Sequence, residues 1–183
     1  MFKPEKVAQV AAYLLRKEGR PAPYMKLLKL MYLADRESVR LYGDTLSGDR
    51  LVSMPHGPVL SLVYELMNGA REDDHWSRWI AARTAYDINT TAQSNHWDLD
   101  ELSGPDREIL DQTYARFGAM SQWDLRDWTH KNCQEWEDPN GSSFDIKPEK
   151  LFLALGVEEK EASERAEKYR ERRSLDRVLS RYR

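Results

Sequence analysis

Hydrophobic positions are densest between residues 24 and 42, where they fall on more than one face of a helix with 3.6 residues per turn. The apolar residues on these faces are Leu27, Leu28, Leu30, Met31, Leu33, Ala34, Val39 and Leu41. A helix that is apolar on most sides is buried in a core rather than laid on a surface. Pro23 suits the start of this helix and Gly43 its end. The pattern therefore predicts a buried central helix on which the rest of the chain packs.

Helical periodicity recurs in shorter segments on both sides of the central helix. The segments predicted to be helical are 4–19, 58–69, 105–117, 121–130 and 148–155. Ser103 is suited to cap the third of these segments, and Ser121 with Asp124 three residues later resembles a capping box at the start of the fourth. Their apolar stripes are expected to face the central helix.

Strand signals are weaker and occur in two places. Residues 80–91 have a β-like pattern and lead through a polar turn at 93–95 to residues 96–98, which predicts a small β-hairpin. The short run at 50–54 follows a Ser-Gly-Asp turn and is expected to form an edge strand. Together these signals predict a mainly α fold, a compact single-domain helical bundle around a buried central helix.

The composition changes after Gly156. Residues 157–183 contain seven Asp or Glu and nine Lys or Arg, and we predict a charged C-terminal helix there. The apolar residues near the end of this tail are Leu175, Val178, Leu179 and Tyr182. We therefore divide the chain into a helical domain at 1–156 and a tail at 157–183 that the domain does not need for folding. Three roles stay open for the tail: a partner-binding arm, a short dimerising helix, or a solvated helix stabilised by ion pairs one turn apart.

Composition limits the class of protein. The 183 residues are 40% hydrophobic and 32% charged, which is typical of a globular protein. A formal net charge of -3 gives no overall attraction for a polyanion, so nucleic acid is not the expected partner. One cysteine, Cys133, excludes an intramolecular disulfide and fits a reducing compartment. Because no apolar run resembles a signal peptide or approaches the roughly 20 residues of a membrane span, we expect a cytoplasmic protein with no membrane partner.

Few residues are suited to catalysis or to binding a cofactor. His130 and Cys133 are the one close pair of soft metal ligands, and since the sequence has no second pair we expect no metal and no other cofactor. The acidic run at 72–74 is more typical of a solvated loop than of a cation site. No Gly-rich oxyanion loop accompanies Cys133. We predict that the protein is not an enzyme and has no catalytic residue.

Four short segments of the sequence carry recognisable motifs: Lys26 to Asp35, Gly48 with Asp49, His56 to Val59, and Leu125 to His130 with Trp136. They read as a K-L-x-K-L-x-Y-x-A-D-like helix, a Gly-Asp pair, an H-G-P-V-like turn and a later L-x-x-x-T-H signature. This set of motifs resembles the hallmark of a known family, the Panacea domain proteins, which are SocA-like or GepA-like. The sequence departs from the family where a proline is expected before the tryptophan, because Glu135 stands there.

The resemblance implies an antitoxin. Proteins of this family neutralise small toxins encoded beside them by direct protein contact. SocA-like members can also act as proteolytic adaptors that hand the toxin to a cytoplasmic AAA+ protease. The expected partners are therefore a cognate protein toxin encoded nearby and, for an adaptor, such a protease. The oligomeric state stays open.

Ten residues are candidates for motif or partner-binding roles. They are Asp35, Arg36, Arg40, Tyr42, His56, Gly57, Pro58, Thr129, His130 and Trp136. Among them Arg36, Arg40, Tyr42 and Trp136 are the candidates for exposed anchors in a protein interface. For His56 we favour a structural role, locking the following helix onto the central one, over a role in lining a partner pocket. We expect the His56 to Pro58 turn and the Thr129–His130 pair to lie close together against the central helix.

Two other classes of function stay open. A phage-associated hydrolase would use His56, His130 and the acidic run, and it would bring both histidines and Asp73 to one cleft. A transcriptional regulator would need a basic recognition helix, and the segment 165–183 is a poor one because acidic residues interrupt it.

Overall fold

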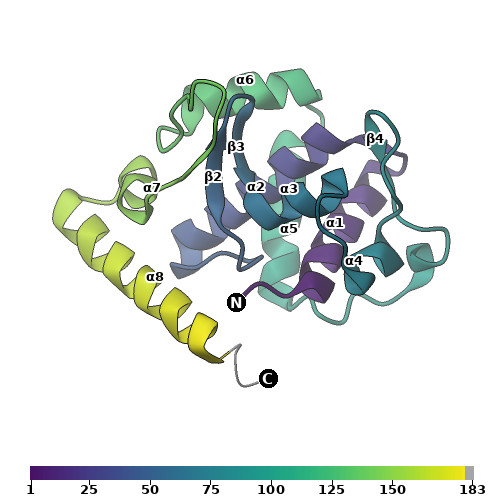
Figure 1. Cartoon of the computed structure of the whole chain (residues 1–183), viewed down its shortest axis with the longest axis horizontal. Coiled ribbons are helices and arrows are strands. Elements are labelled where there is room, and N and C mark those ends of the chain that lie inside the picture. The colour runs from purple at the N-terminus through teal and green to yellow at the C-terminus, as the bar shows by residue number, and fades with distance from the viewer. Residues whose placement is uncertain (180–183) are drawn as a thin grey trace.

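The computed structural model describes residues 1–179, and it is mainly α-helical with little β-structure, as predicted (Figure 1). The α-helices in this range are α1 (Pro4–Glu18), α2 (Tyr24–Tyr42), α3 (Ser61–Asn68), α4 (Asp74–Trp79), α5 (Gly104–Phe117), α6 (Gln122–Asn132), α7 (Pro148–Ala154) and α8 (Glu159–Leu179). A 3-10 helix covers Ser94–His96. The strands are β1 (Ala22–Pro23), β2 (Leu51–Met54), β3 (Gly57–Leu60), β4 (Asp87–Ile88) and β5 (Phe144–Asp145).

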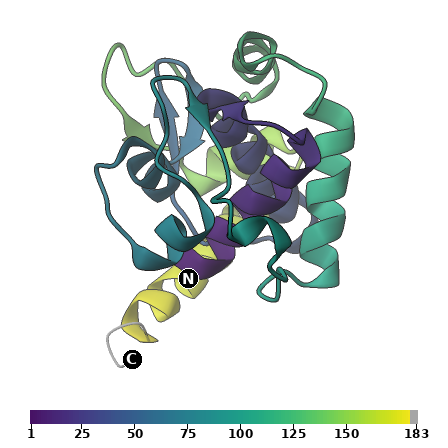
Figure 2. The same ribbon diagram turned by 90° about the vertical axis from the view of Figure 1, so that its right-hand side faces the viewer.

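The α2 helix is the centre of the fold. It contacts α1, α3, α5 and α6 as well as strand β3, and the other elements surround it in both views (Figures 1 and 2). Leu27, Met31 and Ala34 on this helix are almost fully buried. Both predicted ends are confirmed, since the helix begins directly after Pro23 and ends at Gly43, which adopts a left-handed φ of 72°. An apolar pattern on most sides of a helix thus does correspond to a central position.

The small sheet differs in place from the prediction. Strands β2 and β3 form an antiparallel hairpin, and β5 pairs with the other side of β2, so that residues 51–54 form the middle strand and not an edge. The predicted hairpin at 80–98 does not form, because β4 pairs instead with β1, more than sixty residues earlier. The two sides of that segment are joined by an isolated bridge between Ile80 and Thr90 and by a backbone hydrogen bond from Thr84 N to the Asp87 carbonyl. Local alternation reveals a strand but not its partner.

The helix predicted at residues 58–69 begins later than Pro58. Residues 57–60 are the second strand of the hairpin, and the α3 helix starts at Ser61. Its first backbone N–H groups are satisfied by a distant residue, because the Asp49 carboxylate accepts hydrogen bonds from Leu62 N at 3.1 Å and Val63 N at 2.9 Å. A cap supplied from outside the segment leaves no signal in the local sequence.

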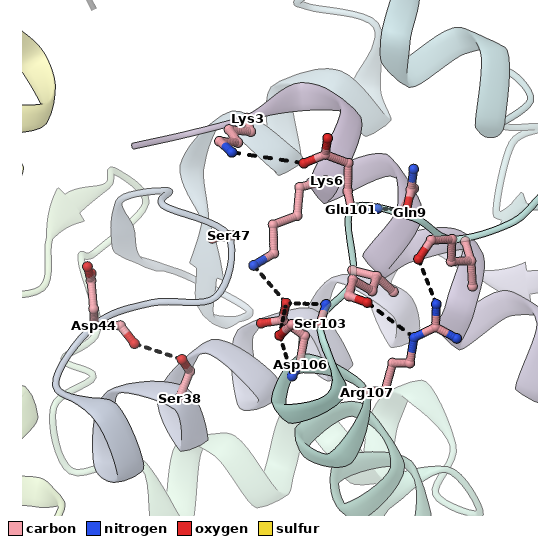
Figure 3. Close-up of polar contacts among 12 residues, drawn as sticks. Lys3, Lys6, Gln9, Ser38, Asp44, Ser47, Glu101, Ser103, Asp106 and Arg107 are labelled. Atoms are coloured by element: carbon pink, nitrogen blue, oxygen red, sulfur yellow. Dashed lines mark hydrogen bonds and ion pairs between the residues drawn. The ribbon is translucent and has the colours of Figure 1, made fainter. Parts of the chain in front are cut away.

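The predicted caps of α5 and α6 are present as capping boxes, formed by Ser103 with Asp106 and by Ser121 with Asp124. Figure 3 shows that Asp106 has a further role, because its carboxylate also forms an ion pair with Lys6 of α1, with Nζ and Oδ2 2.9 Å apart. The start of α5 is therefore both capped by Ser103 and joined to α1 by this ion pair.

The α8 helix lies against α7 along one side of the molecule (Figure 1). Its buried face consists of Ala162, Ala166 and Tyr169, each one turn from the next, and not of the apolar residues near the end of the tail that the sequence pattern indicated. Those later residues are exposed: Leu175 is 63% exposed, Val178 49% and Leu179 58%. Tyr182 lies outside the described residues. Within residues 1–179 no helix is both long and apolar enough to cross a membrane.

Candidate functional site

Four buried polar side chains follow one another along α2 at intervals of three residues: Lys26, Lys29, Tyr32 and Asp35. Each is hydrogen-bonded to a different part of the chain. Lys26 Nζ donates to the Gly118 carbonyl at the end of α5 at 2.7 Å and forms an ion pair with Glu18 at the end of α1 at 2.8 Å. A buried polar group without a partner is costly, so each bond fixes the position of the segment that provides it.

Lys29 holds the His56 to Pro58 turn. Its Nζ donates to the Pro58 carbonyl at 2.9 Å, and its side chain is fully buried. Burial lowers the pKa of Lys29 to about 7, so the amine is largely neutral just above that pH. The lysine is therefore a hydrogen-bond donor inside the fold rather than a surface charge.

Gly57 explains why the turn can approach so closely. It has a φ of +94°, and a Cβ atom at this position would lie 2.8 Å from Lys29 Nζ, 2.8 Å from Thr129 Oγ1 and 3.2 Å from His130 Cδ2. No larger residue has room there, and few adopt this backbone conformation. The turn thus meets both α2 and the end of α6, which confirms that the His-Gly-Pro turn and the Thr129–His130 pair lie together against the central helix.

His130 is partly enclosed at this junction. Its ring stacks on Trp136 with centroids 4.1 Å apart and an interplanar angle of 5°, and Trp136 Nε1 donates to the Met54 carbonyl at 2.9 Å. Burial lowers the pKa of His130, and the nearby charge of Lys29 lowers it further. Its Nε2 is buried and has no hydrogen-bond partner in the described part of the chain. His56, in contrast, is exposed at the tip of the turn.

A buried carboxylate lies next to this junction. Glu135 accepts hydrogen bonds from Tyr32 Oη at 2.6 Å and from Arg36 Nε at 2.7 Å, and its side chain is fully buried. Burial raises the pKa of Tyr32, and the Glu135 charge raises it further. Burial and the same charge raise the pKa of the Cys133 thiol to about 12, so this thiol is protonated at neutral pH. A protonated, buried thiol is unsuited to nucleophilic attack.

Asp35 is hydrogen-bonded to the loop that precedes β2. Its carboxylate accepts hydrogen bonds from Ser47 N at 2.9 Å and from the Ser47 hydroxyl. Burial raises the pKa of Asp35 to about 7 and also raises that of Asp49 in the same loop. Arg173 of α8 crosses this loop and donates to the Gly48 carbonyl at 2.8 Å and to the Asp49 carbonyl. The loop at residues 47–49 is thus hydrogen-bonded both to α2, through Asp35, and to α8, through Arg173.

Two of the four residues expected to be exposed anchors have internal roles instead. Arg36 forms the ion pair with Glu135 and donates to the Ala154 carbonyl, and Trp136 is covered on one face by His130. The other two are on the surface at the end of α2: Tyr42 is 54% exposed, and Arg40 forms an exposed ion pair with Glu37. The sequence alone does not distinguish buried from exposed members of this set. Arg36 is paired inside the protein because the chain folds so that Glu135, 99 residues later, packs against α2.

The residues of the hydrolase hypothesis do not share a cleft. His56 and His130 flank the same turn, but Asp73 is the N-cap of α4, where its carboxylate accepts from His75 N at 3.0 Å and Trp76 N at 3.2 Å. In both views α4 lies away from the β2–β3 hairpin (Figures 1 and 2). Among residues 1–179, no three side chains of His, Cys, Asp or Glu are grouped so that they could hold a metal ion.

Comparison with known families decides what this arrangement belongs to. A family model described as antitoxin SocA-like, Panacea domain, matches residues 27–137. The chain belongs to this family. Comparisons with curated proteins and with solved structures gave no significant match.

The matched range of the Panacea domain contains the contacts of Lys29, Tyr32 and Asp35 described above. It starts within α2 and includes the His-Gly-Pro turn, the Thr129–His130 pair and Glu135. In this Panacea domain the residue at 135 is a buried acid that binds Tyr32 and Arg36, where the resemblance led us to expect proline. The α8 helix lies outside the matched range, although Arg173 bonds it to the Gly48–Asp49 motif.

Proposed function

We propose that this protein is the antitoxin of a toxin–antitoxin pair and neutralises a protein toxin, encoded nearby, by binding it directly in a stoichiometric complex. The observation that carries this proposal is the family match over residues 27–137, since the family is one of SocA-like antitoxins. The partner is a protein and not a nucleic acid, in keeping with the formal net charge of -3.

The geometry of the motif supports a binding role. Lys29, Tyr32 and Asp35 are buried and bonded to other segments, so they stabilise a rigid frame rather than face a substrate. A rigid frame lowers the entropy cost of association, because little must be ordered when the partner arrives. The buried thiol of Cys133, with its raised pKa, also gives no support to turnover through a cysteine nucleophile.

Co-expression with the product of the adjacent reading frame tests the proposal. If the adjacent gene is toxic alone, growth should recover in proportion to the amount of this protein, and the two proteins should co-purify at a constant ratio. The strain should lack its AAA+ proteases in one arm of the experiment. Rescue that persists there indicates neutralisation by binding alone, whereas rescue that needs the protease indicates an adaptor. Rescue at far below equimolar amounts without the protease would contradict the proposal, because it would indicate an enzyme.

A further inference from the structure

A groove of about 270 Å³ separates the end of α2 from α8. Its floor contains the aromatic rings of Phe152 and Tyr169, which are nearly buried and meet edge to face with centroids 6.5 Å apart. Its rim contains Leu41 and Tyr42, which are 45% and 54% exposed. We call this the α2–α8 groove. Exposed apolar side chains beside an aromatic floor are typical of surfaces that bind another protein.

The charges along this groove have one sign. Arg165, Lys168 and Arg172 line it, and the part of the chain that the structure describes contributes no carboxylate to the lining. Arg165 is already paired with Glu161 one turn away at 2.6 Å. Lys168 and Arg172 are exposed, and neither forms an ion pair with a described side chain. Two unpaired cations thus stand beside apolar surface on a chain whose overall charge is negative.

The groove is formed in the structure without a partner, because its α8 wall is anchored. Arg173 follows Arg172 directly and donates to the Gly48 carbonyl at 2.8 Å, to Thr45 Oγ1 at 3.0 Å and to Tyr169 Oη at 2.8 Å. These bonds fix α8 on the loop held by Asp35, so the helix that carries Lys168 and Arg172 has a defined position beside the groove. A preformed surface binds without the cost of ordering its own elements.

We infer that the α2–α8 groove is the contact site for an acidic segment of the toxin, with carboxylates facing Lys168 and Arg172 and an apolar side chain against Leu41 and Tyr42. This inference rests on the proposed function and adds the location and chemistry of the contact. Complementary charge steers such a segment to the groove and orients it, and the apolar rim supplies the part of the affinity that salt does not screen. The aliphatic side chain of Leu41 on the rim favours a protein segment over double-stranded nucleic acid, whose outer surface consists of charged phosphates and sugars.

Charge reversal tests the electrostatic half of this inference. The double variant Lys168→Glu/Arg172→Glu changes the net charge of the groove and leaves the buried face of α8 intact. The matched control is Arg71→Glu/Lys131→Glu, which makes the same change in net charge at two exposed residues outside the groove. Affinity is measured by calorimetry with the purified product of the adjacent reading frame, after circular dichroism has verified that each variant is folded. The groove variant should bind at least about tenfold more weakly, the control should bind like the wild type, and salt should reduce the difference between them.

A second pair of variants tests the apolar half. Tyr42→Ser removes an aromatic ring from the rim, and Tyr86→Ser removes one that is 75% exposed elsewhere on the surface. Tyr42→Ser should weaken binding at least about fivefold, and Tyr86→Ser should not change it.

The outcomes separate the two proposals. If the wild-type protein does not bind the adjacent gene product, the proposed function and this inference are both overturned. If the wild type binds and the groove variants bind equally well, the antitoxin function stands and the groove is not the contact site. If instead the wild type co-purifies with nucleic acid and Lys168→Glu/Arg172→Glu abolishes that association, the groove binds a polyanion and the acidic-segment inference is wrong.

Discussion

Tyr32 and Glu135, 103 positions apart in the sequence, are joined by a hydrogen bond of 2.6 Å between the tyrosine hydroxyl and a fully buried carboxylate. Arg36, one turn further along α2, neutralises the same carboxylate. The end of the α6 region is therefore held to the central helix by a charged group inside the protein. A buried ion pair stabilises little compared with apolar residues, but removing one partner leaves the other uncompensated.

Glu135→Ala should accordingly lower the free energy of unfolding by about 3–5 kcal/mol, because Arg36 and Tyr32 would lose a shared buried acceptor. Glu137→Ala is the matched control, since Glu137 forms an exposed ion pair with Lys150. The control should cost about 1 kcal/mol or less. Urea denaturation of both variants measures the difference, and equal effects would show that the Glu135 contacts add nothing.

Gly57→Ala should be more destabilising than Gly69→Ala. Both glycines have positive φ, 94° and 71°, but a Cβ at 57 would lie 2.8 Å from Thr129 Oγ1 whereas at 69 it would meet nothing within 4 Å. We expect a cost of about 1 kcal/mol at 69, from backbone strain alone, and about 2–4 kcal/mol at 57, where displacement of Thr129 and Lys29 is added. Thermal unfolding of the two variants gives the comparison. Similar costs would mean that the turn can move away from α6 without loss.

Lys29 should make stability depend on pH in alkaline solution. Its pKa is about 7 in the folded protein and near 10.5 when exposed, so between these values the unfolded chain binds more protons than the folded one. Stability contributed by this residue therefore rises with pH from about 7 to about 10.5, by about 5 kcal/mol at most. Lys29→Met removes this contribution. The difference in unfolding free energy between wild type and variant should grow across that range, and a constant difference would show that the buried amine keeps its ordinary pKa.

The structure leads us to expect that the tail contributes to stability. Truncation after residue 156 would remove Ala162, Ala166 and Tyr169 from the core and Arg173 from the Gly48–Asp49 loop. We therefore expect a loss of several degrees or more in melting temperature. Truncation after residue 174 keeps these contacts, removes the exposed apolar residues Leu175, Val178 and Leu179, and should melt close to the full chain. If both truncated proteins melt like the full chain, the α8 contacts do not stabilise the fold.

The amount of structure that the sequence predicts depends on where the relevant signal lies. The bounds of α2 and the caps of α5 and α6 were predicted, because proline, glycine and serine act on the residues next to them. The start of α3 was placed too early because its cap, Asp49, is twelve positions before Ser61. The inner face of α8 was overlooked because alanine gives a weak hydrophobic signal even where it is fully buried, as at Ala166.

The candidate site shows the same limit. The contact between the turn and Thr129 was predicted on the expectation that both sit at helix ends packed on one apolar element. The contact is present, but the turn joins strands β2 and β3 and does not lie at a helix end. The internal roles of Arg36 and Trp136 were not predicted, since Arg36 pairs with Glu135 and Trp136 donates to the Met54 carbonyl, and both partners are distant in the sequence. The cationic α2–α8 groove joins residues 41–43 to residues 165–172, and no local pattern connects these two segments.

The interval of three residues between Lys26, Lys29, Tyr32 and Asp35 has a geometric consequence. An α-helix advances about 100° per residue, so each step of three turns the next side chain back by about 60°, and the four together sweep about half of the helix circumference. The four side chains therefore project from α2 in different directions, and each bonds to a different segment: the end of α5, the His-Gly-Pro turn, the region after α6 and the Ser47 loop. Because all four segments are attached to the same helix, residues on the outer surface between them can change in sequence while these attachments stay the same.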